Sequence, residues 1–199
     1  AHPEKARSPS TALATLIHTL EQLPRSVTPF DHAALVTIIH AQLGEKAFGT
    51  TPGHAELNAT LRAHDPAVLK ALGDKAVAMT HAIAKTWGLE IETAWTEVFE
   101  PAVNHPDSFS VLEQAWNSLE QSGDTRGLSK FIKMEKPFSW SEDFGRFTHV
   151  FPGAMFGLGA GEDTPPLHDE YYDFPDDLIE PAVAYFGAIM DVIQNKTLD

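Results

Sequence analysis

The residues best suited to chemistry lie near the end of the chain, in the stretch TPPLHDEYYDFPDD at residues 164–177. His168 follows two prolines and precedes Asp169 and Glu170. Imidazole is a common metal ligand, and a neighbouring carboxylate often orients it. Because one ligand does not hold a metal ion, His168 is either part of a larger site or an isolated surface histidine.

The composition limits which sites are available. The chain has 199 residues and no cysteine, so a metal would be held by its 10 His and 28 Asp and Glu residues. The formal net charge of −14 disfavours nucleic acid and anionic membranes as partners, since both require basic surfaces. No run of about 20 apolar residues and no signal-peptide pattern is present, which predicts a soluble, cytoplasmic protein.

Two further features of the sequence, a glycine run and a histidine near the start, indicate less about function. Gly157, Gly159 and Gly161 form a GxGxG run, but acidic residues and prolines follow it, so no helix N-terminus is available for a phosphate. His2 lies in AHPEKARSPS, just before the first expected helix, and by itself is most simply a surface histidine.

Residues 1–100 alternate between helical and strand patterns. Ser8 and Pro9 are typical of a helix start, and Pro24 is expected to end that helix. Strands are predicted at 34–43 and 54–62. A second helix is predicted to begin at Asp65–Pro66 and end at Gly88, with a core face of Leu69, Leu72, Ala76, Met79, Ile83 and Trp87.

A further strand is predicted at 89–99, which makes the order α-β-β-α-β. With one strand in front, this order becomes the β-α-β-β-α-β split sandwich of ferredoxin-like folds. The missing strand would precede Ala1, so we expect the chain to be a fragment.

Pro101 and the NHPD turn at 104–107 predict a boundary. Beyond it the patterns favour a helix near 108–121, a short strand at 130–134, a helical turn at 141–147 and a strand at 152–161. A last helix is expected from about Asp177, although Pro181 places its start in question. Its predicted buried face consists of Ile179, Val183, Phe186, Met190 and Ile193.

Six stretches in this order together resemble the metal-dependent amidohydrolases of the aminoacylase and hippurate-hydrolase type. That family also contains indole-acetyl-amino-acid hydrolases and N-acetyldiaminopimelate deacetylase. The stretches are AHPEKARSPSTA, GEKAFGTTPGHAELNATLR, EPAVNHP, SEDFGRF, PGAMFGLGAG and LHDEYYDF.

The resemblance implies an α/β protein with an α+β lid. Residues 1–102 would be a ferredoxin-like lid and dimerisation domain without its first strand. Residues 103–199 would be the C-terminal segment of an α/β metallopeptidase catalytic domain. The N-terminal segment, with the other metal ligands and the general-base glutamate, would lie outside this chain.

The resemblance also assigns roles to four residues. His168 matches the last metal ligand, and His2 matches a lid histidine that stabilises the oxyanion, often across a dimer. Arg62 matches an arginine that is a candidate for binding a substrate carboxylate, although it is equally an exposed strand cation. Gly49 stands in the substrate-contacting lid loop where many relatives have Asn, and Glu170 stands where proline is usual. The departure at Gly49 puts one polar substrate contact in doubt.

The complete enzyme implied by the resemblance would use two divalent metal ions, zinc first, with manganese, cobalt or nickel as alternatives. It would hydrolyse N-acyl amino acids or peptide-like amides through a metal-activated water, as a homodimer joined by the lid. This chain alone is expected to be inactive. The alternatives are a non-catalytic dimerisation or binding module, and a split enzyme whose other half is a separate chain.

Overall fold

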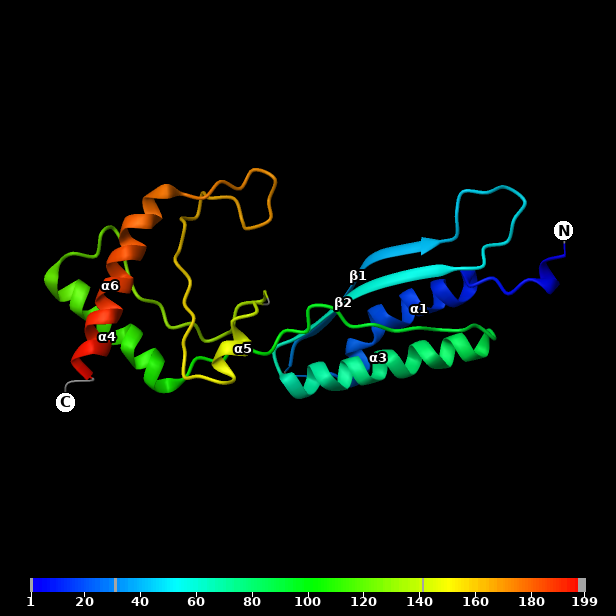
Figure 1. Ribbon diagram of the computed structural model, residues 1–199, viewed down its shortest axis with the longest axis horizontal. Coiled ribbons are helices and arrows are strands. Elements are labelled where there is room, and N and C mark those ends of the chain that lie inside the picture. The colour runs from blue at the N-terminus through cyan, green and yellow to red at the C-terminus, as the bar shows by residue number, and fades with distance from the viewer. Residues whose placement is uncertain (1, 31, 141, 197–199) are drawn as a thin grey trace. The chain divides into compact units, whose positions relative to one another are not determined.

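The computed structural model describes residues 2–30, 32–140 and 142–196, whose course is drawn in Figure 1. The chain divides into two compact units, unit 1 at residues 1–98 and unit 2 at residues 99–199. Unit 1 contains η1 (Pro3–Lys5), α1 (Ser10–Gln22), α2 (Pro24–Val27), β1 (Ala34–Leu43), β2 (Ala55–Ala63) and α3 (Pro66–Thr86). Unit 2 contains α4 (Pro106–Ser122), α5 (Gly145–Thr148), η2 (Asp176–Leu178) and α6 (Ile179–Lys196).

The sheet of unit 1 is an antiparallel pair, which confirms the first two predicted strands. The register runs from Ala34 opposite Ala63 to Leu43 opposite Ala55, with an irregularity between Ile38 and His40. Because side chains alternate along a strand, one face of the pair packs on the helices, and the other is exposed and carries both polar residues and the apolar Leu35 and Ile39.

Helices α1 and α3 cover the apolar face, as Figure 1 shows. The core between them and the sheet contains Leu20, Leu23, Val36, Leu72 and Ala76. Leu72 has no exposed surface, as expected from its place on the predicted core face of α3. Trp87, which the sequence assigns to the same face, is instead exposed, because it caps the end of the helix beyond this core.

The predicted ends of α3 are confirmed by hydrogen bonds. The Asp65 carboxylate accepts from the backbone N–H groups of Ala67 and Val68 at 2.7 and 3.1 Å. At the other end Gly88 has a φ of +63°, and the N–H of the residue after it donates to the carbonyl of Ala84 at 2.9 Å. This left-handed C-terminal turn favours glycine because it has no Cβ.

The start of α1 differs slightly from expectation. Pro9 precedes the helix rather than occupying its first position, and Ser8 Oγ accepts the backbone N–H of Ser10 at 3.3 Å. Pro24 ends α1 as predicted but also begins α2, because proline has the φ angle and lacks the N–H that suit a first helical turn.

The strand predicted at 89–99 is wrong. The segment runs back along α3 without pairing to another strand, and the ring of Trp95 packs against Gly73. Apolar alternation favours a strand, but a strand also needs a second strand to pair with, and the sheet of the described residues contains only β1 and β2. The mixed α/β character is therefore confirmed, whereas the four-stranded ferredoxin-like sandwich stays a prediction.

The core of unit 2 lies between α4 and α6. It is built from Leu112, Ala115, Trp116 and Tyr185, with Phe156 of the preceding segment packed against it. The helix predicted near 108–121 is confirmed as α4. The last predicted helix is confirmed as η2 followed by α6. Pro181 lies in the first turn of α6, where backbone N–H groups have no partner within the helix, so it does not interrupt the helix.

Three expectations for unit 2 need correction or restriction. The segments 130–134 and 152–161 are not strands, because neither has a paired neighbour in the described chain. The predicted turn at 141–147 is present as α5, but Ser141 lies outside the described residues. The face of α6 predicted to be buried is exposed at Ile179, Val183, Phe186, Met190 and Ile193, because α4 packs against the opposite face.

None of the described helices combines the length and the apolar character needed to span a membrane.

Candidate active site

His168 lies on an exposed turn of unit 2, held in the left-handed backbone region at a φ of +72°. The N–H of Asp169 donates to the carbonyl of Pro166 at 3.0 Å, and Asp169 Oδ1 accepts the N–H of Tyr171 at 2.9 Å. Asp169 therefore orders the turn through its backbone and side chain. A left-handed conformation is uncommon for a residue with a Cβ, and such conformations cluster at functional sites.

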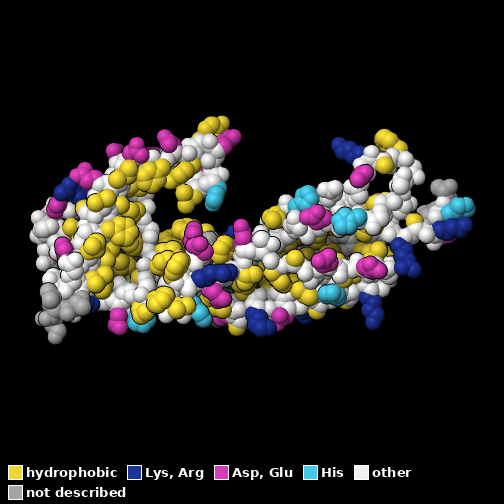
Figure 2. All heavy atoms as spheres, viewed as in Figure 1, with side chains coloured by type: hydrophobic (Ala, Val, Ile, Leu, Met, Phe, Trp, Pro, Cys, Tyr) yellow, Lys and Arg dark blue, Asp and Glu magenta, His cyan; other side chains and the backbone are white. Residues whose placement is uncertain are grey.

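Acidic residues flank His168 in the sequence, and unit 2 as a whole is acidic. Residues 99–199 carry 18 Asp and Glu against 6 Lys and Arg. Figure 2 shows acidic side chains along the edge of unit 2 formed by the loop that leads to α6. This local excess of negative charge favours cations over anions at the turn.

The described residues do not build a metal site by themselves. No group of three or more His, Asp or Glu side chains in that part of the chain is placed to hold a metal ion. His168 is positioned as one ligand, and a stable site for a divalent cation requires several.

The segment that leads to the His168 turn is fixed by Asn104. Its amide nitrogen donates to the carbonyl of Met155 at 2.9 Å, and its oxygen accepts the N–H of Met155 at 2.8 Å. The N–H of His105 donates to the carbonyl of Gly153 at 2.9 Å. The start of α4 thus holds residues 153–155 as a neighbouring strand would.

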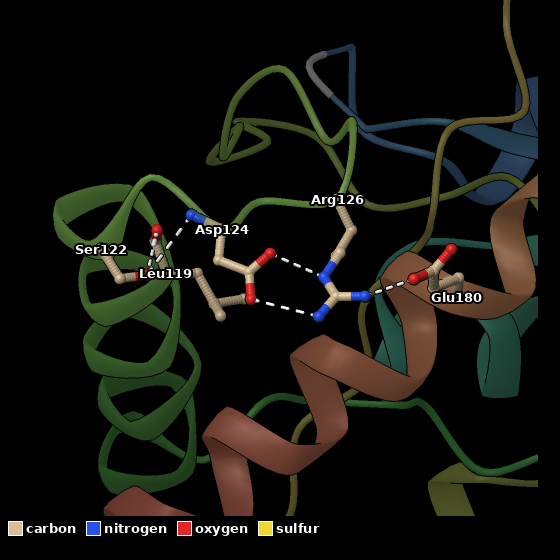
Figure 3. Close-up of polar contacts among 5 residues, drawn as sticks. All are labelled: Leu119, Ser122, Asp124, Arg126 and Glu180. Carbon is tan, nitrogen blue, oxygen red and sulfur yellow. Dashed lines mark hydrogen bonds and ion pairs between the residues drawn. The ribbon is translucent and has the colours of Figure 1, made fainter.

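An ion-pair bridge fixes the start of α6, the element that follows the His168 turn. Arg126 contacts Asp124, with Nε to Oδ1 at 2.6 Å, and also contacts Glu180 (Figure 3). Hydrogen bonds to Asp124 first, and to Glu180 second, raise the pKa of the guanidinium. Because Arg126 follows α4 and Glu180 belongs to the first turn of α6, the bridge joins the two helices across a loop.

The other three predicted site residues lie in unit 1. His2 is exposed, and its Nδ1 lies 3.1 Å from Glu4 Oε1. Gly49 has a φ of +76° in the loop between β1 and β2, and Arg62 lies near the far end of β2, opposite Leu35. The stretch of β2 from Ala55 to Arg62 spans roughly 23 Å at about 3.3 Å per residue, so the structure does not bring Gly49 and Arg62 together.

Sequence reasoning missed Asn104, Arg126 and Tyr185. The sequence indicates only a turn at the asparagine, and its double contact with Met155 joins residues 51 positions apart. Arg126 and Glu180 are 54 positions apart, and Tyr185 and its partner Leu112 are 73 apart. Local periodicity contains no signal for such pairs.

No protein family model matches the chain. Its fold is shared with the crystal structure of a protein named as an aminohydrolase, from methicillin-resistant Staphylococcus aureus. The TM-score is 0.73 at 13% identity, over 96% of this chain and 48% of that one. The molecule therefore has the mixed α/β fold of about half of that protein.

Similarity at the sequence level is more specific. N-acetyldiaminopimelate deacetylase from Limosilactobacillus fermentum is 27% identical over 84% of this chain and 41% of its own length. The protein of the same name from Bacillus licheniformis is 24% identical over 94% of this chain and 49% of its own length. The chain is thus similar to proteins named as deacetylases, and it spans about half the length of the curated relatives that it matches.

Proposed function

We propose that this chain is part of a metal-dependent amidohydrolase that cleaves N-acyl amino acids or similar linear amides. The observation that carries the proposal is the exposed His168, held at positive φ by the Asp169 turn, in a chain related to deacetylases. An exposed imidazole on an ordered, acidic loop is suited to donate one nitrogen to a cation.

In this proposal His168 is one ligand of a site for two divalent ions, with zinc as the first candidate. Divalent ions at such sites lower the pKa of a bound water to about 7. One ligand does not hold an ion, so the remaining ligands and the general base would come from polypeptide other than residues 1–199. Alone, the chain is expected to bind metal weakly and to have no hydrolytic activity.

The residues of unit 1 are proposed to act on the substrate. Arg62 would pair with a substrate carboxylate through its planar guanidinium, and His2 would donate a hydrogen bond to the developing oxyanion. Gly49 would leave the loop without the side-chain amide that many relatives carry there. A homodimer through unit 1 and a cytoplasmic location belong to the same proposal.

The test compares two exposed histidines of unit 2 in the enzyme completed with the remainder of a relative. His168→Ala should lower kcat/KM for an N-acetyl amino acid more than 100-fold and reduce bound metal, measured by plasma mass spectrometry. His149→Ala, which removes another exposed imidazole of unit 2, should change neither value. Undiminished hydrolysis and metal content in His168→Ala would refute the ligand assignment.

The second candidate function is a non-catalytic dimerisation or binding module. It is favoured by the lack of a grouped metal-ligand set in the described part of the chain. A complex with the remainder of a relative that binds no metal and hydrolyses no amide, while unit 1 still dimerises, would support this alternative.

A further inference from the structure

The sheet of unit 1 has an outer face, defined as the side of the β1–β2 pair that points away from α1 and α3 (Figure 1). Every second side chain of the strands, for example Val36, Leu57 and Leu61, packs toward the helices. The side chains between them therefore point outward. The outward side chains include Leu35, Thr37 and Ile39 on β1 and Asn58, Thr60 and Arg62 on β2.

The two strands contribute different chemistry to the outer face. Strand β1 supplies its large apolar side chains, because Leu35 and Ile39 are 55 and 64% exposed. Strand β2 supplies only hydrogen-bonding groups, from Asn58, Thr60 and Arg62. An apolar row therefore runs beside a polar row, which suits a ligand that has one apolar and one polar side.

The charge of the outer face changes sign along β2. Glu56 lies at one end and Arg62 at the other, about 20 Å away at about 3.3 Å per residue. The Glu56 carboxylate also accepts from the side-chain amide of Asn58 at 3.2 Å. An anionic ligand group is repelled at the Glu56 end and attracted at the Arg62 end. A guanidinium has five N–H donors and can pair with a carboxylate through two of them at once.

The apolar side chain nearest to the charge is Leu35, which lies directly opposite Arg62 in the strand register. The Cβ atoms of such opposite residues are about 4.5–5.5 Å apart. The side chain of an amino acid is attached to the carbon next to its carboxylate, whereas its acyl group lies farther away. A carboxylate paired with Arg62 therefore brings the amino-acid side chain, rather than the acyl group, over Leu35.

Ile39 extends this apolar surface at an irregular point of the sheet. Ile38 lies opposite Ala59 and His40 opposite Asn58, so Ile39 is an extra residue in β1. Bulges of this kind are frequent next to active sites, because they change the direction of a side chain. Thr60, two residues from Arg62 on the same face, adds a hydroxyl about 6.6 Å along β2 that can bond to an amide group.

We propose that the outer face binds the amino-acid part of the substrate and selects for an apolar side chain. The substrate carboxylate pairs with Arg62, its side chain lies against Leu35 and Ile39, and its amide group lies near Thr60. The inference rests on the proposed function, in which Arg62 binds a substrate carboxylate. It narrows the substrate class to N-acyl derivatives of apolar amino acids.

The experiment titrates the isotope-labelled full chain with small ligands and follows the backbone amide signals of residues 35–39 and 58–62 by nuclear magnetic resonance. N-acetyl-leucine should bind about fivefold more tightly than N-acetyl-asparagine, which has nearly the same shape but a polar side chain. N-acetyl-leucinamide lacks the carboxylate, and N-benzoylglycine has its apolar group on the acyl side. Each should also bind about fivefold more weakly than N-acetyl-leucine.

Three variants at exposed positions assign the contacts. Leu35→Thr should weaken the binding of N-acetyl-leucine about fivefold and leave that of N-acetyl-asparagine unchanged, because only the apolar contact is lost. Arg62→Gln should weaken both ligands about tenfold, since both use the carboxylate. Leu43→Thr, the same change at an exposed leucine at the end of β1, should leave both affinities unchanged. The amide signals of α3 show whether each variant keeps the fold of unit 1.

Three results would overturn the inference. They are the absence of ligand-dependent shifts on the outer face, equal affinity for N-acetyl-leucine and N-acetyl-asparagine, and shifts without ligand that depend on protein concentration and disappear in Leu35→Thr. The last result would assign the face to contact between two copies of the chain.

The binding titration requires neither metal nor hydrolysis, so it separates this inference from the proposed function. An enzyme completed with the remainder of a relative should have a higher kcat/KM for N-acetyl-leucine than for N-acetyl-asparagine. Hydrolysis of both at equal kcat/KM would refute the inference alone. Selective binding by the full chain, without any hydrolysis by the completed protein, would refute the proposed function alone.

Discussion

The Tyr185 hydroxyl ties the two helices of unit 2 together. It donates to the carbonyl of Leu112 at 2.8 Å, and the residue is only 3% exposed. Burial raises the pKa of the phenol to about 12, because the phenolate would lose its hydration. One side chain thus combines a buried hydrogen bond with a titration far above neutral pH.

Replacing Tyr185 by Phe should lower the free energy of unfolding by about 1–2 kcal/mol at neutral pH, since a buried carbonyl loses its partner. The folded pKa lies above the unfolded value of about 10, so this stabilisation is complete below pH 10 and is lost as the pH rises toward 12. Phenolate absorbance should show one of the three tyrosines titrating late. Tyr171→Phe, which removes an exposed ring, should leave that late step in place, and its loss in this control would contradict the assignment.

His168 illustrates how backbone geometry adds information to residue type. The sequence places an imidazole between prolines and acids, and the structure adds the left-handed backbone and the hydrogen bonds of Asp169. Glu170, the departure from the usual proline, is exposed and leaves the turn intact. The metal content and activity of His168→Ala decide whether this geometry serves a metal ligand.

At the scale of elements, α3 is defined by its caps. Hydrogen bonds from the backbone N–H groups of Val68 and then Ala67 lower the pKa of Asp65, and His32 Nε2 lies 3.5 Å from its carboxylate. The charged form is thus favoured in the folded state. The stabilisation by the charged Asp65 carboxylate is complete above pH 3.8, the ordinary pKa of this group. It is lost as the pH falls through the lower pKa of the folded state.

Substitution of Asp65 separates the cap from its charge. Asp65→Ala should lower the thermal midpoint of unit 1 by several degrees at pH 7, because two N–H groups lose their acceptor. Asp65→Asn retains a hydrogen-bond acceptor, so its thermal midpoint at pH 7 should stay close to that of wild type. Because asparagine does not titrate, this variant should lose less stability than wild type on acidification to about pH 3. Thermal unfolding followed by circular dichroism at both pH values measures this, and an Ala variant as stable as wild type would contradict the capping role.

The incorrectly predicted strands have a common cause. Segments 89–99, 130–134 and 152–161 each have strand-like composition, and each packs one side against a helix. Ladder formation depends on a second strand, which is often distant in sequence, and local pattern does not reveal whether one is present. The predictions at 34–43 and 54–62 are correct because each of these strands pairs with its neighbour in sequence.

At the scale of the whole molecule, each unit has a core of its own. Leu72 lies at the centre of the first core, and Trp116 and Tyr185 form the second. No buried residue belongs to both clusters among the described residues. Independent cores of this kind are expected to unfold as separate cooperative units.

Calorimetry of the full chain should therefore show two transitions. Gly145→Ala should lower only the transition of unit 2, because a Cβ there would lie 2.0 Å from the carbonyl oxygen of Glu100. Asp65→Ala should lower only the other. Gly187→Ala, at a helical position with open space, should leave unit 1 unchanged and stabilise unit 2 by about 0.5–1 kcal/mol. A single transition shifted by both Gly145→Ala and Asp65→Ala would show that the units unfold together.

The local elements follow from the sequence alone. The N-cap at Asp65, the left-handed turn at Gly88 after the end of α3, the hairpin strands and the last helix result from capping chemistry and side-chain periodicity, which act over a few residues. The similarity to proteins named as deacetylases is also found at the level of the sequence. Only the tertiary structure showed which face of α6 is covered, that Asn104 holds Met155, and that Tyr185 binds Leu112. These features depend on contacts between residues far apart along the chain, and an apolar helix face looks the same in sequence whether or not another element covers it.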